Sequence, residues 1–156
     1  MDVERLGGDQ WADLRGLRLA ALADAPEAFW ATSAEESGFD ESRWRMFVSG
    51  VAWFAVRRDA DVVGAAGGVQ TEGGEAELIG MWVAPGVRGR GYGADLVSAV
   101  CDWARGVGAA AIDLWIVQGN DPARSLYERC GFRPTGERAP LPSPRVGVEE
   151  RMRLTL

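Results

Sequence analysis

The spacing of apolar residues in the first part of the chain predicts one short strand followed by a helix. A strand is expected at residues 3–6, and residues 10–23 repeat their apolar positions with the period of a helix. The stripe is formed by Trp11, Leu14, Leu17, Arg18 and Ala21. We expect an amphipathic helix that packs this stripe against the rest of the protein.

A segment without a clean period follows at residues 24–40, where proline, serine, acidic and aromatic residues are mixed. We expect this segment to form a mobile, partly helical lip. Asp40 has a side chain that suits a helix N-cap, and it directly precedes a short helical pattern over residues 41–49. A short capped helix is therefore predicted there.

Three β-prone runs come next, at residues 51–57, 62–69 and 75–84. The first two are separated by the four residues 58–61, whose composition is typical of a hairpin turn. A short glycine-containing loop separates the second run from the third. Strands joined by such short connections pair in antiparallel fashion, so we expect a β-meander.

Helices and strands alternate in the second half of the chain. Residues 91–108 carry a helical stripe, and residues 111–117 are a nearly continuous apolar run, as expected for a central strand buried on both faces. Asp121 is expected to cap a further helix that starts at Pro122 and ends at Gly131. The last two predicted strands, residues 132–137 and 146–154, are joined by a proline-rich loop.

This order is a meander followed by β-α-β-α-β-β, without a linker, a repeat or a low-complexity tract. The sequence therefore predicts an α/β or α+β fold with three layers. With 156 residues, 47% of them hydrophobic, the chain has the length and the apolar content of one ordinary domain. We expect a single domain over residues 1–156.

The net charge of the chain limits the classes of molecule that it can be expected to bind. The net charge is −6, which argues against a nucleic-acid partner because phosphate backbones are bound by basic surfaces, and it suits a cationic substrate instead. The first ten residues lack the pattern of a signal peptide, and no apolar run approaches the length of a membrane span. We expect a cytoplasmic protein without a membrane partner.

The sequence contains no histidine and no lysine, so all 17 basic residues are arginine. This excludes Ser-His-Asp and Cys-His nucleophiles, histidine metal sites, a pyridoxal Schiff base and a phosphate-binding lysine. Cys101 and Cys130 lack the spacing of a metal or redox motif, so we expect reduced structural thiols and no metal site.

The strongest chemical signal is the loop RGRGYG at residues 88–93, between a predicted strand and a predicted helix. Glycines let the backbone N–H groups converge there, and a helix N-terminus adds partial positive charge, so the loop suits a pyrophosphate. A merely flexible loop and a dinucleotide fingerprint through Gly89, Gly91 and Ala94 are alternatives. The fingerprint is disfavoured because too little chain remains for further βαβ units.

RGRGYG resembles the RxxGxG element of the GCN5-related N-acetyltransferases (GNAT), and NDPARSLYERCGF downstream is similar to the family's second element. The resemblance implies a mixed, mostly antiparallel sheet with helices on both faces, and acetyl-CoA as the acetyl donor. The residues that it assigns to the cofactor are Trp82, Val83, Arg88, Gly89, Arg90, Gly91, Tyr92, Gly93, Ala94, Asn120 and Ala123.

The resemblance also implies direct acetyl transfer to an amine. It places a backbone N–H at Met81, in a bulged strand, to polarise the thioester carbonyl, Tyr127 to protonate the departing sulfur, and Glu77 to act as general base. Glu75, Glu72 and water remain alternative bases.

The acceptor walls are expected from residues 26–40 of the lip, from the Trp53 strand and from the loop over residues 139–147. Apolar surface would come from Phe29, Trp30 and Trp44, and negative charge from Glu35, Glu36 and Asp40. A small-molecule amine is favoured. Acetylation of a protein N-terminus or side chain and a non-catalytic acyl-CoA-binding module remain open, as does a homodimer.

Overall fold

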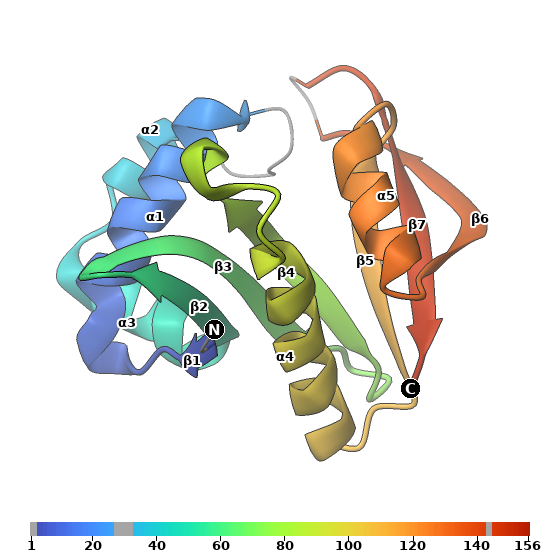
Figure 1. The fold of residues 1–156 in the computed structure, drawn as a ribbon, viewed down its shortest axis with the longest axis horizontal. Coiled ribbons are helices and arrows are strands. Elements are labelled where there is room, and N and C mark those ends of the chain that lie inside the picture. Colours follow the sequence, from blue (N-terminus) through green and yellow to red (C-terminus); the bar gives the residue numbers. More distant parts are fainter. Residues whose placement is uncertain (1–2, 27–32, 143–144) are drawn as a thin grey trace.

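A computed structural model describes residues 3–26, 33–142 and 145–156. Seven strands form one sheet in the order β1-β2-β3-β4-β5-β7-β6, and helices flank it (Figure 1). The strands are β1 (Val3–Arg5), β2 (Ala52–Arg58), β3 (Asp61–Gln70), β4 (Ala76–Val83), β5 (Ala111–Val117), β6 (Arg133–Pro140) and β7 (Val148–Thr155). The helices are α1 (Trp11–Asp24), α2 (Ser33–Ser37), α3 (Glu41–Gly50), α4 (Tyr92–Gly106) and α5 (Asp121–Arg129).

The predicted order of elements and the three-layer fold class are confirmed. Every strand pair is antiparallel except β4–β5, which is parallel, so the sheet is mixed and mostly antiparallel. The parallel pair arises because α4 carries the chain over the sheet between β4 and β5. The partly helical lip is confirmed by α2, whereas residues 27–32 lie outside the described residues.

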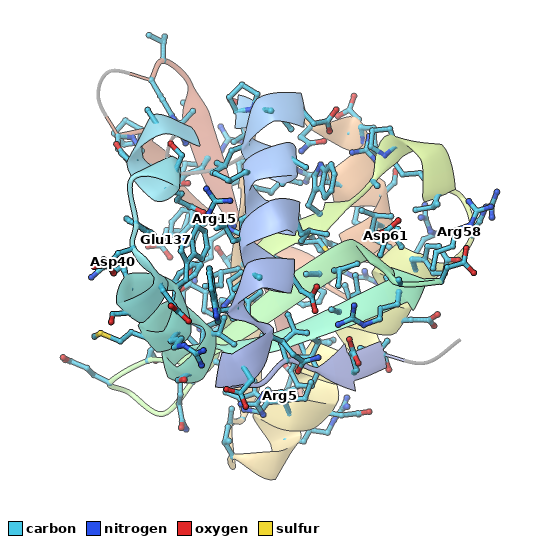
Figure 2. The ribbon with its side chains drawn as sticks, turned by 90° about the vertical axis from the view of Figure 1, so that its left-hand side faces the viewer. Arg5, Arg15, Asp40, Arg58, Asp61 and Glu137 are labelled. Atoms are coloured by element: carbon cyan, nitrogen blue, oxygen red, sulfur yellow. The ribbon has the colours of Figure 1, made fainter. Side chains whose placement is uncertain are left out.

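One face of the sheet is covered by α1 and α3, which lie in front of the strands in Figure 2. The predicted stripe of α1 is buried through Leu14, Leu17 and Ala21, and each fully buried leucine contributes about 1.5–3 kcal/mol. The predicted cap of α3 is confirmed, because the Asp40 carboxylate accepts a hydrogen bond from the Arg43 backbone N–H at 2.8 Å.

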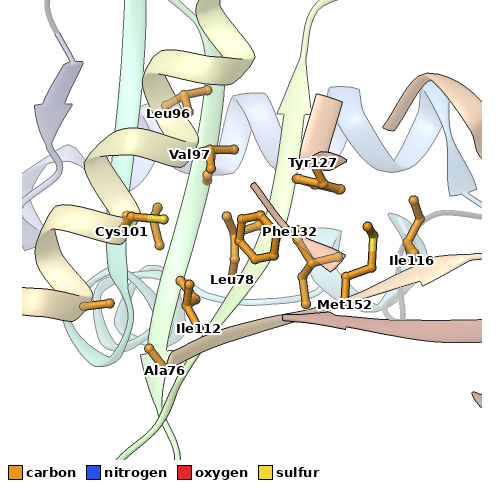
Figure 3. Close-up of a cluster of buried hydrophobic side chains, with 14 of the residues drawn as sticks. Ala76, Leu78, Leu96, Val97, Cys101, Ile112, Ile116, Tyr127, Phe132 and Met152 are labelled. Atoms are coloured by element: carbon orange, nitrogen blue, oxygen red, sulfur yellow. The ribbon is translucent and has the colours of Figure 1, made fainter. Parts of the chain in front are cut away.

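The opposite face carries the larger core, packed under α4 and α5. Figure 3 shows this cluster, in which the Tyr127 and Phe132 rings meet edge to face at 5.8 Å. Ile112 and Leu114 of β5 are completely or almost completely buried in it. The prediction that β5 is central and buried is therefore confirmed.

The expected cap of α5 is wrong by one residue. Asp121 is the first residue of the helix, and the N-cap is Asn120. The reason lies in the backbone, since the Asn120 carbonyl accepts the helical hydrogen bond from the Arg124 N–H at 3.1 Å. Pro122 still lies in the first turn, where its missing N–H costs nothing.

The sheet opens between β4 and β5. These strands have only two register pairs, Ala76–Ile112 and Glu77–Asp113, and beyond them the strands diverge (Figure 1). No other described residue of β4 is paired with β5. We call this feature the fork, with its closed end at the Glu77–Asp113 pair. Of the helices that the structure describes, none is long and apolar enough to cross a membrane.

Candidate active site

A cavity of about 530 Å³ occupies the fork. Its lining residues come from both faces of the sheet, so the cavity connects the α5 side with the α1–α3 side through the gap between β4 and β5. The lining comprises Arg18, Glu36, Phe39, Arg43, Phe47, Trp53, Glu77, Leu78, Ile79, Gly80, Met81, Leu114, Trp115, Ile116, Val117, Asn120, Ala123 and Tyr127. All three predicted catalytic residues are among them.

Glu77 lies at the closed end of the fork and lines the cavity. Burial raises the pKa of its carboxyl group, the negative charge of Asp113 raises it further, and Arg151 partly opposes both effects. A carboxyl group whose pKa lies above the ordinary range is a better proton acceptor near neutral pH. The environment of Glu77 therefore suits a general base.

Asp113 is the centre of an ion-pair network beside Glu77. Its side chain is only 6% exposed, and it accepts a hydrogen bond from Arg153 Nε at 2.7 Å and another from Arg151. Burial alone would raise the pKa of Asp113, but the two arginines outweigh it and hold the pKa below the ordinary value. Asp113 is therefore ionised at neutral pH, and its charge acts on Glu77.

Glu75, one alternative base, belongs to the same network. Its carboxylate accepts a hydrogen bond from Arg153 at 2.8 Å, and it does not line the cavity. Glu72, the other alternative, is exposed in the loop between β3 and β4, also away from the cavity lining. Among the three glutamates, the geometry favours Glu77.

The predicted bulge in β4 is present at Gly80 and Met81. Between the pairs Gly67–Ile79 and Ala65–Trp82, β4 has one more residue than β3. Gly80 has a φ of +62°, and a Cβ atom there would lie 2.5 Å from the Trp53 ring. Only glycine allows this backbone conformation so close to Trp53.

In the open part of the fork, Trp82 and Val83 pair with β3 on one side and with no described strand on the other. Their outer backbone edge is therefore open toward β5. An extended ligand arm can add to such an edge as another strand would. The Trp82 side chain itself is fixed by a hydrogen bond from its Nε1 to Asp24 at 3.0 Å.

The glycine loop turns sharply into α4. Gly89 and Gly91 have φ values of +81° and +85°, and Gly91 is the N-cap of the helix. A Cβ atom at either position would meet no protein atom within 4 Å, so these glycines serve the backbone turn and leave its outer side free. Backbone N–H groups at such a helix start suit an anion.

The residues of this loop make different contacts with the rest of the protein. The Arg88 guanidinium donates to the Val83 carbonyl at 2.8 Å and to Asp24 at 3.1 Å, so it braces the loop against β4 and α1. Tyr92 is buried in the core, so it faces an anion only through its backbone. At Gly93 a Cβ atom would lie 2.9 Å from Leu126, which shows close packing of α4 on α5.

Three predicted residues of α5 and its cap, Asn120, Ala123 and Tyr127, line the cavity together. Burial raises the pKa of the Tyr127 hydroxyl well above its ordinary value. The hydroxyl therefore stays protonated at any physiological pH. It can act only as a donor and not as a base, and the raised pKa makes it a weaker acid than an ordinary tyrosine.

The acceptor walls differ in part from the sequence prediction. Phe39, Phe47 and Trp53 line the cavity, whereas Trp44 is fully buried in the core behind them, so the prediction that Trp44 forms a wall is wrong. Trp44 faces inward because the stripe of α3 packs it between the Phe39 and Phe47 rings. The predicted wall residues Phe29 and Trp30 lie outside the described residues.

Two of the three acidic residues expected to give the lip its negative charge, Glu36 and Asp40, are engaged within the protein, and Glu35 does not line the cavity. Glu36 forms a buried ion pair with Arg18 at 2.6 Å, and Asp40 caps α3. The Arg18 guanidinium also lies over the Phe47 and Trp53 rings, at 5.6 and 5.7 Å from their centres. The lip therefore presents fewer acidic groups than its sequence indicates.

Sequence reasoning missed Arg18, Arg43 and Asp113 as site residues. Two of them had a visible signal, namely a charge where the pattern predicts burial. Arg18 lies in the apolar stripe of α1, and Asp113 interrupts the apolar run of β5. Arg43 had no such signal because it is exposed on α3.

The two cysteines are free, as expected. Burial raises the pKa of the Cys101 thiol to about 11 and raises that of Cys130 as well, so neither is an activated nucleophile. In the part of the chain that the structure describes, no group of three or more Cys, Asp or Glu side chains is arranged to hold a metal ion.

Known proteins that are similar to this chain in sequence or in structure are acetyltransferases. A sequence profile of the acetyltransferase (GNAT) family matches residues 19–132. The mycothiol acetyltransferase of Clavibacter michiganensis subsp. michiganensis is 36% identical over 85 residues, which are 53% of this chain and 27% of that protein. The chain thus spans less than a third of that relative.

Solved structures share the fold over the full length. The ribosomal-protein-alanine N-acetyltransferase of Brucella melitensis superposes with a TM-score of 0.82 at 20% identity, covering 100% of both chains. The yncA protein of Salmonella typhimurium, solved with its cofactor acetyl-CoA, gives a TM-score of 0.82 at 20% identity, covering 100% of this chain and 94% of that one.

Proposed function

Because the chain belongs to the acetyltransferase (GNAT) family, we propose that it transfers the acetyl group of acetyl-CoA directly to a primary amine of a small molecule. The observation that carries this proposal is the cavity in the fork. It brings the half-buried Glu77, the bulge at Met81 and the protonated Tyr127 into one space. We propose that residues 1–156 act as a single acetyltransferase domain.

The residues present fit acetyl-CoA. The positive φ values at Gly89 and Gly91 and the open side of that turn suit a pyrophosphate, with Arg90 at the same loop. The unpaired edge of Trp82 and Val83 suits the extended pantetheine arm. Asn120 and Ala123 line the cavity beside this edge. The acetyl-CoA of the Salmonella typhimurium relative supports the same ligand here.

Acetyl-CoA would supply the acetyl group and a thiol as leaving group. Glu77, directly or through water, would take the proton of the attacking amine, helped by its raised pKa. The Met81 N–H would stabilise the negative charge that develops on the carbonyl oxygen, which is worth about 3 kcal/mol for one such donor. Tyr127 would donate its hydroxyl proton to the sulfur.

The size of the cavity supports a small acceptor, because about 530 Å³ is a usual volume for a small-molecule site. The names of the similar proteins do not agree on an acceptor, since one is called a mycothiol acetyltransferase and another a ribosomal-protein-alanine N-acetyltransferase. The presence of both Glu77 and Tyr127 in the cavity supports an enzyme over a non-catalytic binding module. The two free thiols suit a cytoplasmic location.

Thermal unfolding with added ligands tests the proposal. A ligand that binds only the native state stabilises it by RT ln(1 + [L]/Kd), about 2.7 kcal/mol at a hundredfold excess over Kd. Acetyl-CoA and CoA should raise the melting temperature, whereas NAD and ATP at equal concentration should have much less effect. Thiol release from acetyl-CoA in the presence of amines then measures turnover. Strong stabilisation by NAD without any by CoA would contradict the proposal.

A further inference from the structure

Four charged side chains line the cavity among the described residues, namely Arg18, Glu36, Arg43 and Glu77. Arg18 and Glu36 neutralise each other through two hydrogen bonds, at 3.1 and 2.6 Å, and both are buried. This pair is already satisfied within the protein. The ionic character that the cavity offers to a ligand therefore comes from Arg43 and Glu77.

Arg43 lies on α3, on the side of the cavity formed by the N-terminal helices. Its guanidinium stacks over the Phe39 ring at 5.0 Å from the centre, which orients it. It forms no salt bridge with any residue that the structure describes. The nearest acidic residue in sequence, Asp40, is engaged in capping α3.

Glu77 occupies the closed end of the fork, on β4. It also lacks a salt bridge to any described residue, although Asp113 and Arg151 act on it through space. Among the described residues, the cavity thus contains one carboxylate and one guanidinium without a salt bridge, held by different elements. Apolar side chains of Phe47, Trp53 and Ile79 also line it.

We propose that the acceptor is an amine that also carries a carboxylate on an apolar body, as an amino acid does. The amine would meet Glu77, the carboxylate would pair with Arg43, and the apolar part would contact the half-buried Phe47 and Ile79 side chains. This inference rests on the proposed acetyl transfer to an amine. It replaces the cationic acceptor expected from net charge, because Glu36 and Asp40 are already engaged within the protein.

Matched acceptors test the inference. Leucine, leucinamide and isoamylamine form one series, and phenylalanine, phenylalaninamide and phenethylamine form another, with thiol release from acetyl-CoA as the assay. We expect kcat/KM to be about tenfold or more higher for each amino acid than for its amide and its decarboxylated amine. The amide has the less basic amine, so more of it is neutral at pH 7, and amine basicity does not explain a preference for the amino acid over the amide. The decarboxylated amine is more basic than the amino acid, so its kcat/KM is compared per neutral amine.

Variants of α3 assign the preference to Arg43. Arg43→Ala should raise KM for the amino acids about tenfold and leave KM for the amides unchanged, and Arg43→Glu should abolish acetylation of the amino acids while improving that of diamines. Arg45→Ala is the control, since Arg45 lies on the same helix but pairs with Asp9 and Glu41. It should keep the preference of the wild type.

The outcomes separate the two proposals. Amides or decarboxylated amines that are acetylated as well as the amino acids would overturn the carboxylate inference and leave acetyl transfer intact. Binding of acetyl-CoA without turnover of any carboxylated amine would also overturn it. An Arg43→Ala variant that is folded and keeps the preference would remove Arg43 from recognition. Failure of acetyl-CoA to bind at all would contradict the proposed function itself.

Discussion

Glu77 and Asp113 are register partners at the closed end of the fork, so two carboxyl-bearing residues stand side by side where the sheet begins to open. Their pKa values are shifted in opposite directions. Arg151 and Arg153 hold the pKa of Asp113 below its ordinary value. Burial raises the pKa of Glu77, and the negative charge of Asp113 raises it further. The charge of Asp113 thus adds to burial in raising the pKa of Glu77.

The first prediction follows from this pair. Asp113→Asn removes a negative charge beside Glu77 and leaves Arg151 less neutralised, so both changes lower the pKa of Glu77. If deprotonated Glu77 is required for turnover, the acid limb of the kcat/KM profile should move to lower pH. A pH–rate profile on any accepted amine measures this. Asp102→Asn, which removes an exposed carboxylate on α4, is the control and should leave the limb in place.

The second prediction concerns Glu77 itself. Glu77→Gln should lower kcat/KM for the amine by a factor of about 10² to 10⁴ at neutral pH, with partial recovery at higher pH as more of the amine becomes neutral. Acetyl-CoA affinity should hardly change. Glu72→Gln serves as the matched control and should retain full activity. Wild-type turnover of Glu77→Gln across the pH range would remove Glu77 from the mechanism.

A measurement of thermal stability distinguishes a loss of catalysis in Glu77→Gln from a loss of the native fold. The pKa of Glu77 is raised in the native state, so the carboxylate destabilises the fold once pH exceeds its unfolded-state pKa, and this cost is complete above the folded-state pKa. Glu77→Gln should therefore melt at a higher temperature than the wild type at neutral pH. The difference should vanish at acid pH. A variant that is both inactive and less stable at pH 7 would contradict this account.

The third prediction concerns the leaving group. Tyr127→Phe removes the hydroxyl that would protonate the sulfur, while the ring keeps its packing on Phe132. We expect kcat to fall by a factor of about 10². The loss should be smaller with an acyl donor whose thiol is more acidic, because that thiolate leaves without a proton. An equal loss with both donors would argue against this role for Tyr127.

The fourth prediction tests the glycine loop. Gly91→Val places a branched side chain at a φ of +85°, which costs about 1–2 kcal/mol of stability. Since a Cβ atom there meets no protein atom within 4 Å, any large loss of CoA affinity would come from a clash with the ligand. Gly86→Val, also without close neighbours but without a positive φ, is the control. Normal CoA binding by folded Gly91→Val would contradict the assigned role.

The fifth prediction concerns the bulge. Gly80→Ala combines a φ of +62° with a Cβ atom 2.5 Å from the Trp53 ring and 2.9 Å from the Arg18 guanidinium. We expect a loss of about 2 kcal/mol or more in the free energy of unfolding. Gly16→Ala, in the middle of α1 without close neighbours, should instead stabilise by about 0.5–1 kcal/mol. The free energy of unfolding of both variants, measured with a denaturant, tests this prediction.

Much of the fold was predictable because its elements carry local signals. The stripe of α1, the cap at Asp40 and the apolar run of β5 are each encoded by a few neighbouring residues, and all three are confirmed. The cap of α5 was misplaced because Asn120 and Asp121 are both good caps. Which of the two residues becomes the N-cap depends on the course of the backbone between β5 and α5.

The site was predictable only where motifs or strand position reveal it. Glu77 and Tyr127 were found through resemblance to a family, and the cavity contains both. The pairing of Arg18 with Glu36 joins α1 to α2, and that of Asp113 with Arg151 joins β5 to β7. Such contacts between segments distant in sequence depend on tertiary packing, so no local pattern predicts them.

The closed end of the fork is the point about which the two halves of the sheet would rotate. Because β4 and β5 are hydrogen-bonded at one end only, a small rotation of the β5–β7–β6 half about that end widens or narrows the cavity in proportion to distance from it. The walls near Ile116 and Val117 would travel furthest, and Glu77 would hardly move. Substrates of different width would then be accommodated at the open end, without a change in the position of Glu77 at the closed end.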